Sequence, residues 1–174
     1  VVEPKVDTPY KFGMIQGNVS NSDIYYLIGG MNGFYMATGN SSLSAIDVYL
    51  EETKGGYYLY TKSGNSKQYI NMVLSADGMH VNGAYQDKAS TVYTYDKTAK
   101  TLVATMTKGD ETEPYWFGTR NDKSYTTVGP CAVSYAGFYC QFYAVEADTP
   151  DTPDQPDTPD TPDTPDTPDT PDTP

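Results

Sequence analysis

A polar residue and a ring recur together at a fixed interval along this chain. The polar positions, 45 residues apart, are Asn32, Asp77 and Asp122. The rings, each three residues further on, are Tyr35, His80 and Tyr125. A flat ring beside a carboxylate or an amide suits a pyranose, because the ring stacks on the C–H face of the sugar while the polar group binds its hydroxyls. The pattern predicts a glycan-binding position in at least one of three repeats.

Both residue types also recur for structural reasons. Asn and Asp are common in hairpin turns, where they tolerate left-handed backbone, and tyrosine is common in strands because it packs well there. The rings alternate with apolar residues, and period-2 geometry predicts that most of these lie on the opposite, packed face; they are Phe34, Met36, Met79, Val81 and Val128. The recurrence alone leaves the binding and the packing interpretations open.

The third repeat contains the strongest single candidate. Trp116 is the only tryptophan of the chain, and it stands next to Tyr115 and ahead of polar turn residues. Tyr115 recurs with Tyr25 and Tyr69, which is typical of packing. We predict the main glycan site in this repeat, formed by Trp116, Tyr115, Arg120, Asp122 and Tyr125. The alternative is a tryptophan that fills the interior.

Catalytic motifs are absent from the sequence. His80 is the single histidine, and no recognisable serine or cysteine partner accompanies it. The acids at Glu51 and Glu111 belong to loops or strand ends, so we expect no enzyme activity, no cofactor and no metal. Cys131 and Cys140 form no CxxC pair; either a small disulfide loop or two free thiols is possible, and we favour free thiols.

The net charge of −12 belongs mostly to one segment. Nine aspartates recur at every third position from Asp148 to Asp172, which leaves about −3 for the rest of the chain. Arg120 is the only arginine and the lysines form no stripe, so nucleic-acid binding is not expected. No apolar run is long enough for a membrane span, so membrane insertion is not expected either.

Residues 147–174 consist of Ala147 followed by Asp-Thr-Pro repeats, with Gln155 in place of one threonine. Proline fixes φ and removes a backbone donor, and aspartate repels aspartate, so we expect a disordered or extended strut of roughly 85 Å. Asp7-Thr8-Pro9 repeats the theme. We therefore expect a linker at residues 1–9, a binding module at 10–146 and a linker at 147–174. This organisation indicates a monomeric module that is linked to others in a secreted or bacterial cell-surface protein.

Four strand-like runs recur in the same order in each of three segments of about 45 residues. In chain order they cover residues 11–16, 24–29, 34–38, 45–50, 57–62, 68–73, 79–83, 91–96, 102–107, 115–120, 124–128 and 140–145. Asn-Gly, Asp-Gly or similar turns separate the second and third runs, which predicts three hairpins. Twelve strands in three units predict an all-β fold, a β-trefoil, with a β-sandwich as the alternative.

The module also resembles known proteins. Its repeat layout resembles the β-trefoil lectins. The stretches "YYLYTKSGNSKQYINMV" and "YWFGTRNDKSYTTVG" resemble tyrosine-rich modules of secreted surface proteins of gut Firmicutes, including starch-adherence proteins. The resemblance implies carbohydrate binding, with starch-type α-glucan as the ligand. Ricin-type lectins carry Q-x-W in each repeat, and here Gln141-Phe142-Tyr143 alone approximates it. The alternative is an adhesion or spacer domain with a protein ligand or none.

Overall fold

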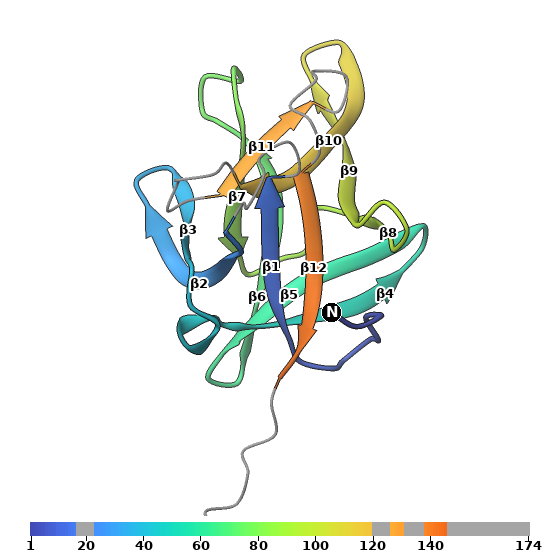
Figure 1. Ribbon diagram of the computed structural model, residues 1–174. Helices are drawn as coiled ribbons and strands as arrows, with labels where there is room; N and C mark the ends of the chain where they lie inside the picture. The colour runs from blue at the N-terminus through green and yellow to red at the C-terminus, as the bar shows by residue number, and fades with distance from the viewer. Residues whose placement is uncertain (17–22, 120–125, 131–137, 146–174) are drawn as a thin grey trace, which may run out of the picture.

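The computed structural model describes residues 1–16, 23–119, 126–130 and 138–145, and these form an all-β domain (Figure 1). In order of the chain, the elements are β1 (Tyr10–Gln16), β2 (Tyr25–Asn32), β3 (Tyr35–Gly39), the short 3-10 helix η1 (Ser42–Ser44), β4 (Asp47–Thr53), β5 (Gly56–Ser63), β6 (Ser66–Leu74), β7 (Val81–Gln86), β8 (Thr94–Asp96), β9 (Thr101–Lys108), β10 (Glu111–Thr119), β11 (Thr126–Pro130) and β12 (Phe138–Ala144). Each of the twelve predicted runs overlaps one of these strands, in the same order.

Three antiparallel pairs correspond to the predicted hairpins: β2–β3, β6–β7 and β10–β11. The β2–β3 turn consists of Gly33 and Phe34, and Gly33 supplies the positive φ, 61°, that a tight turn between twisted strands requires. In the β6–β7 connection Gly78 has a φ of 68°. The predicted turn between β10 and β11 lies outside the described residues.

Six strands form a nearly closed antiparallel sheet. β12, β1, β4 and β5 pair in that order, and β8 pairs with β9. A bridge joins β5 to β8 through two hydrogen bonds between Tyr57 and Tyr93, with N···O distances of 2.9 and 2.8 Å. The Cys140 amide of β12 donates to the Lys100 carbonyl, next to β9, at 2.6 Å. This closure leaves little exposed sheet edge.

Aromatic rings fill the interior of this sheet. Phe12, Phe117 and Phe142 are fully buried, with ring centroids 5.9 Å apart for Phe12–Phe117 and 5.2 Å for Phe12–Phe142. Gly83 of β7 lies where the hairpins meet, because a Cβ there would lie 2.7 Å from the Met36 sulfur. The missing side chain lets β3 and β10 approach β7, and this contact holds the three hairpins in one arrangement.

The segment at residues 1–9, for which the sequence predicts a linker, contacts the domain. The Val2 amide donates to the Phe142 carbonyl at 2.8 Å, and the Asp7 amide donates to the Leu50 carbonyl at 2.9 Å. The Tyr60 hydroxyl donates to the Asp7 carboxylate at 3.1 Å. The Asp-Thr-Pro unit in this segment is therefore held against β4 and β5.

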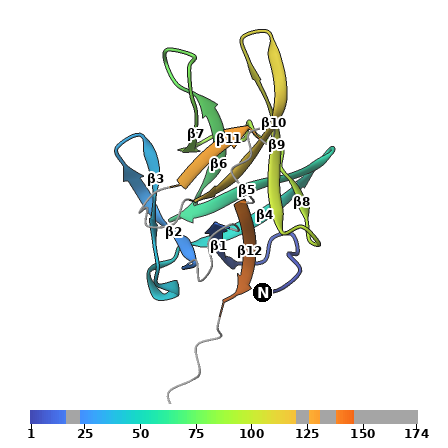
Figure 2. The same cartoon turned by 45° about the horizontal axis from the view of Figure 1, so that its top comes forward.

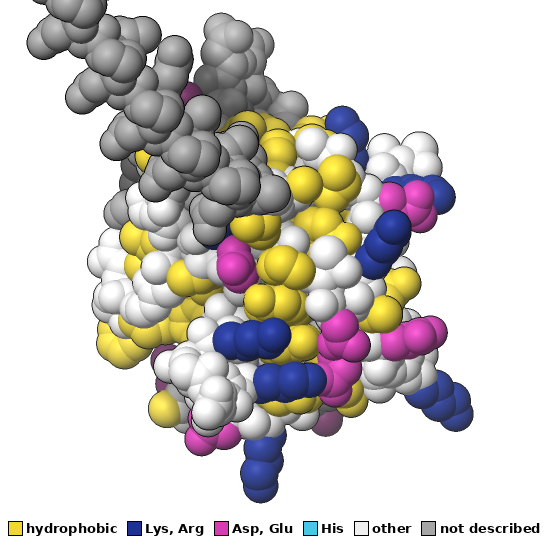
Figure 3. Space-filling view, turned by 90° about the horizontal axis from the view of Figure 1, so that it is seen from below, with side chains coloured by type: hydrophobic (Ala, Val, Ile, Leu, Met, Phe, Trp, Pro, Cys, Tyr) yellow, Lys and Arg dark blue, Asp and Glu magenta, His cyan; other side chains and the backbone are white. Residues whose placement is uncertain are grey.

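The outer face of β4, β5 and β6 accounts for part of the high tyrosine content. Tyr49 and Tyr60 stack with ring centroids 5.1 Å apart, and the ammonium groups of Lys62 and Lys67 each lie 4.2 Å from one of these ring centroids. Lys67 also pairs with Glu51. Seen from below, lysine and acidic side chains lie next to one another among apolar ones rather than in separate areas (Figure 3).

Buried tyrosines predict an alkaline limit to stability. Burial raises the pKa of Tyr93 and Tyr85 above the usual value, and that of Tyr143 to about 12. Since unfolding restores a pKa of about 10, the unfolded chain loses these protons first, so stability is fully present below about pH 10 and falls above it. Denaturation midpoints measured against pH should decline above about pH 10, and less steeply in Tyr93→Phe. Complete tyrosine ionisation near pH 10 with unchanged circular dichroism would contradict this.

Candidate functional site

A hollow of about 840 Å³ opens between the hairpins, and we call it the hairpin hollow. The β2–β3 and β6–β7 hairpins project at the end of the domain opposite to the end of β12 (Figures 1 and 2). The β2–β3 hairpin contributes Met31, Phe34 and Tyr35. The β6–β7 hairpin contributes Leu74, Asp77, Met79, His80, Asn82 and Gly83, and β9 and β10 contribute Lys108 and Tyr115. Residues from three separate segments thus converge on one space.

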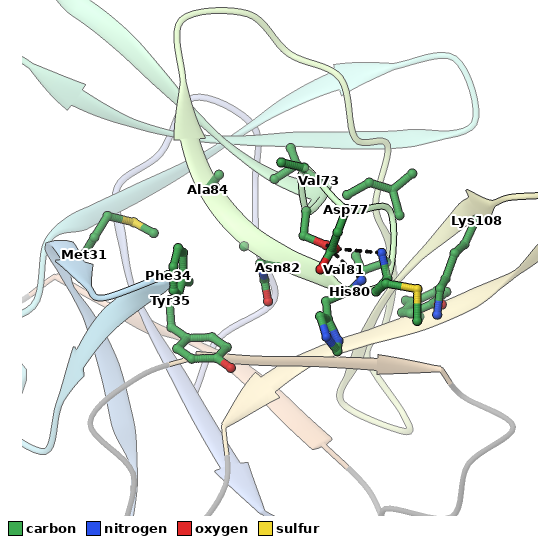
Figure 4. A pocket seen from close by; sticks show the side chains of 16 residues that line it. Met31, Phe34, Tyr35, Val73, Asp77, His80, Val81, Asn82, Ala84 and Lys108 are labelled. Carbon is green, nitrogen blue, oxygen red and sulfur yellow. Dashed lines mark hydrogen bonds between the residues drawn. The ribbon is translucent and has the colours of Figure 1, made fainter.

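One side of the hairpin hollow is aromatic. Phe34 and Tyr35 stand at its edge, with 83% and 38% of their surface exposed. Figure 4 shows both on the side opposite to His80 and Lys108, with Asn82 between the two sides. Aromatic rings exposed to this extent leave a face available to a ligand.

The predicted separation of rings from apolar neighbours is correct for two of the five apolar residues and wrong for two others, and the side chain of Val128 is not among those that the structure describes. Met36 and Val81 are buried, as expected. Phe34 and Met79 are exposed instead and share the hollow with the rings. Both lie in turns, where the alternation of side chains between two faces of a strand does not apply.

Asp77 has a structural role in the β6–β7 connection. Its carboxylate accepts hydrogen bonds from the Ser75 hydroxyl and from the Met79 amide, the latter at 2.9 Å. These bonds hold the pKa of Asp77 below its usual value, with the Ser75 hydroxyl as the main cause. The Ser75 hydroxyl oxygen also accepts from the His80 amide at 2.9 Å. Asp77 therefore fixes the loop that presents Met79 and His80, which is the backbone role that aspartate often has in turns.

Tyr115 and Trp116 are neighbours in β10 but do not form one aromatic platform. Successive side chains of a strand point to opposite faces. Tyr115 is 4% exposed and borders the hairpin hollow, in agreement with the packing interpretation of its recurrence. Trp116 is half-buried and borders a different hollow, of about 510 Å³, with Lys100, Tyr139 and Gln141. We call this second space the Trp116 hollow.

The remaining predicted residues divide into two groups. Asn32 is the last residue of β2 and pairs in register with Tyr35. Arg120, Asp122 and Tyr125 lie outside the described residues, as does Cys131. The structure thus brings Tyr35, Asp77, His80 and Tyr115 to the hairpin hollow and places Trp116 apart from them.

Sequence reasoning missed several exposed apolar residues at the hairpin hollow. Met31, Leu74 and Met79 are 48%, 41% and 59% exposed. Their exposure has a signal in the sequence, because each of them lies within a few residues of a turn glycine or aspartate. At such positions a strand leaves the packed sheet. The remaining cysteine that the structure describes, Cys140, is a buried free thiol, and burial raises its pKa above the usual value.

Two properties of the described residues bear on the class of site. They contain no group of three or more His, Cys, Asp or Glu side chains able to hold a metal ion. Within the same ranges, no helix has the length and apolar character needed to cross a membrane.

Comparison with known protein families, with curated proteins and with solved structures finds no significant match for this chain. The fold and the two hollows therefore carry the functional argument. Together they define an all-β domain with surface hollows that expose aromatic side chains.

Proposed function

We propose that this chain is a noncatalytic carbohydrate-binding module with β-trefoil architecture. The pairing order supports the architecture, because β1, β4, β5, β8, β9 and β12 surround one aromatic core and three strand pairs, β2–β3, β6–β7 and β10–β11, extend from them. A β-trefoil has six barrel strands and three capping hairpins in this order. The spacing of about 45 residues between equivalent runs supports it as well.

The observation that carries the function is the composition of the hairpin hollow. Phe34 and Tyr35 expose ring surface on one side, and His80, Asn82 and Lys108 offer polar atoms toward the same space. A sugar binds in such a place by stacking its C–H face on a ring while its hydroxyls bond to the polar groups. Starch-type α-glucan is the first ligand to test, on the strength of the resemblance to starch-adherence modules.

The position of the hairpin hollow suits a tethered module. It lies at the end of the domain away from the end of β12, the strand after which the Asp-Thr-Pro repeats follow in the sequence (Figure 1). An extended linker on that side would leave the hollow facing outward. Weak sites gain from such tethering, because each later contact becomes intramolecular. This arrangement fits a secreted or bacterial cell-surface protein with several modules.

A second candidate function is adhesion to a protein. Met31, Leu74 and Met79 give the hairpin hollow an apolar rim, and exposed methionine is common at surfaces that bind polypeptides. A competition experiment with a neutral polysaccharide and an apolar peptide separates the two functions. The polysaccharide would bind the polar groups of His80 and Asn82, whereas the peptide would bind the apolar rim.

Affinity electrophoresis in gels containing soluble starch tests the proposal. We expect the domain to be retarded in starch and to run freely in a gel without polysaccharide, with His80→Ala retarded less than the wild type. A pull-down with insoluble starch, cellulose and mannan identifies the preferred polymer. Free migration in every polysaccharide, together with no capture by any insoluble one, would exclude the carbohydrate function and leave protein adhesion.

A further inference from the structure

The Trp116 hollow has the parts of a second binding site. Its rings come from different strands: Trp116 from β10, half-buried, and Tyr139 from β12, 36% exposed. Gln141 lies two residues further along β12 and is 8% exposed. Residues 98–101, from the β8–β9 turn and the start of β9, form another wall. Among the described residues, none borders both this hollow and the hairpin hollow.

The orientation of Trp116 leaves its ring as the ligand-facing part. The indole N–H is buried and has no hydrogen-bond partner among the described residues, so the surface that the side chain exposes is ring carbon. A buried donor without an acceptor costs free energy. Stacking on a sugar is a role that the exposed indole face of Trp116 fits.

The polar groups of the Trp116 hollow are held in place. The Tyr143 hydroxyl donates to the Gln141 side-chain oxygen at 2.7 Å, which fixes the position of the amide. The Asp96 carboxylate accepts from the Thr98 and Ala99 amides at 2.8 and 2.9 Å and fixes the turn. Lys100 has a φ of 56°, a conformation that is uncommon for a residue with a side chain.

We propose that the Trp116 hollow is a second glycan-binding site, which takes a neutral oligosaccharide by stacking on Trp116 and Tyr139 with hydrogen bonds from Gln141 and Lys100. This inference rests on the proposed carbohydrate function. Because Tyr115 and Trp116 point to opposite faces of β10, one sugar cannot contact both hollows. A single module then holds two glycan chains, or two segments of one chain, and gains avidity on a polymer.

Tryptophan fluorescence reads this site selectively, since Trp116 is the only tryptophan. The probe is maltoheptaose, titrated into the intact domain with excitation at wavelengths that tyrosine does not absorb. We expect a saturable change in emission. Tyr139→Ala should weaken that titration about fivefold through loss of one stacked ring, while Tyr35→Ala should leave it unchanged. Trp116→Phe keeps a ring but lacks the tryptophan fluorescence, so maltoheptaose binding to this variant is measured by calorimetry instead.

Calorimetric stoichiometry separates failure of this inference from failure of the proposed function. Two sites are supported if the wild-type domain binds two maltoheptaose molecules. In that case Tyr35→Ala and Tyr139→Ala should each bind one, at concentrations that leave the weakened site empty. One molecule per domain with unchanged Trp116 emission overturns the second site and leaves the hairpin hollow. One molecule that Tyr139→Ala weakens and Tyr35→Ala does not supports the Trp116 hollow and overturns the hairpin hollow. No heat and no emission change overturn both for this glucan.

Discussion

Replacing Gly56 by alanine is expected to destabilise the domain by about 3 kcal/mol and to lower its melting temperature by roughly 10 °C. A Cβ at this position would lie 2.2 Å from the Tyr93 carbonyl oxygen, far inside contact distance, and that oxygen is backbone. The same carbonyl accepts the Tyr57 amide in the bridge between β5 and β8. The added methyl group therefore forces apart β5 and β8, whose bridge helps to close the sheet.

The measurement is thermal and urea denaturation followed by circular dichroism. Gly39→Ala is the matched control, because its Cβ would meet the Ile28 side chain at 3.2 Å, and a side chain can move where a backbone carbonyl cannot. We expect a loss of less than about 1 kcal/mol for the control. Equal losses in the two variants would show that the contact between β5 and β8 does not determine the stability of the domain.

The strands could be predicted from the sequence because their signals are local. Short runs rich in tyrosine, valine and threonine, separated by Asn-Gly or Asp-Gly, define strands and turns without knowledge of the tertiary structure. The contacts that close the sheet are harder to predict from the sequence. The bridge between Tyr57 and Tyr93 and the fit of Gly83 against Met36 depend on contacts between distant segments, and no local pattern encodes them.

The candidate site was predictable in part for the same reason. The recurring positions at Tyr35 and His80 meet in one hollow, whereas the sequence treats each repeat as a separate site. The alternation of a strand, when extended through a turn, predicts a packed position for Phe34, which is exposed instead. The sequence predicts one glycan site that contains both Tyr115 and Trp116, whereas the pleat of β10 directs them to different hollows.

The N-terminal segment shows a further limit of composition. Asp7-Thr8-Pro9 has the same letters as the repeats at residues 147–174, so composition predicts the same extended linker for both. Its Asp7 amide nevertheless bonds to Leu50, and its Asp7 carboxylate to Tyr60. A short polar segment can be ordered when the neighbouring strands offer unpaired backbone groups, and this depends on the partner rather than on the segment.

Removing both rings of the hairpin hollow should cause the largest loss of glycan affinity. Phe34→Ala combined with Tyr35→Ala deletes two stacking surfaces, each worth about 1 to 1.5 kcal/mol, so we expect binding of soluble starch to weaken on the order of 30- to 100-fold. The fold should tolerate the change, because Phe34 is 83% exposed in a turn and Tyr35 lies at the first position of β3. Affinity electrophoresis over a series of starch concentrations measures the dissociation constant.

Leu43→Ala is the matched control for this double variant. Leu43 is 96% exposed in η1, outside the hairpin hollow, so the control removes an exposed apolar side chain that no ligand in the hollow would contact. We expect wild-type retardation for Leu43→Ala. If the double variant is also retarded like the wild type, the rings of the hairpin hollow do not bind the polysaccharide. If it loses all retardation but still captures an apolar peptide, the ring pair serves the glycan and the methionine rim serves a separate protein contact, because the variant leaves Met31 and Met79 unchanged.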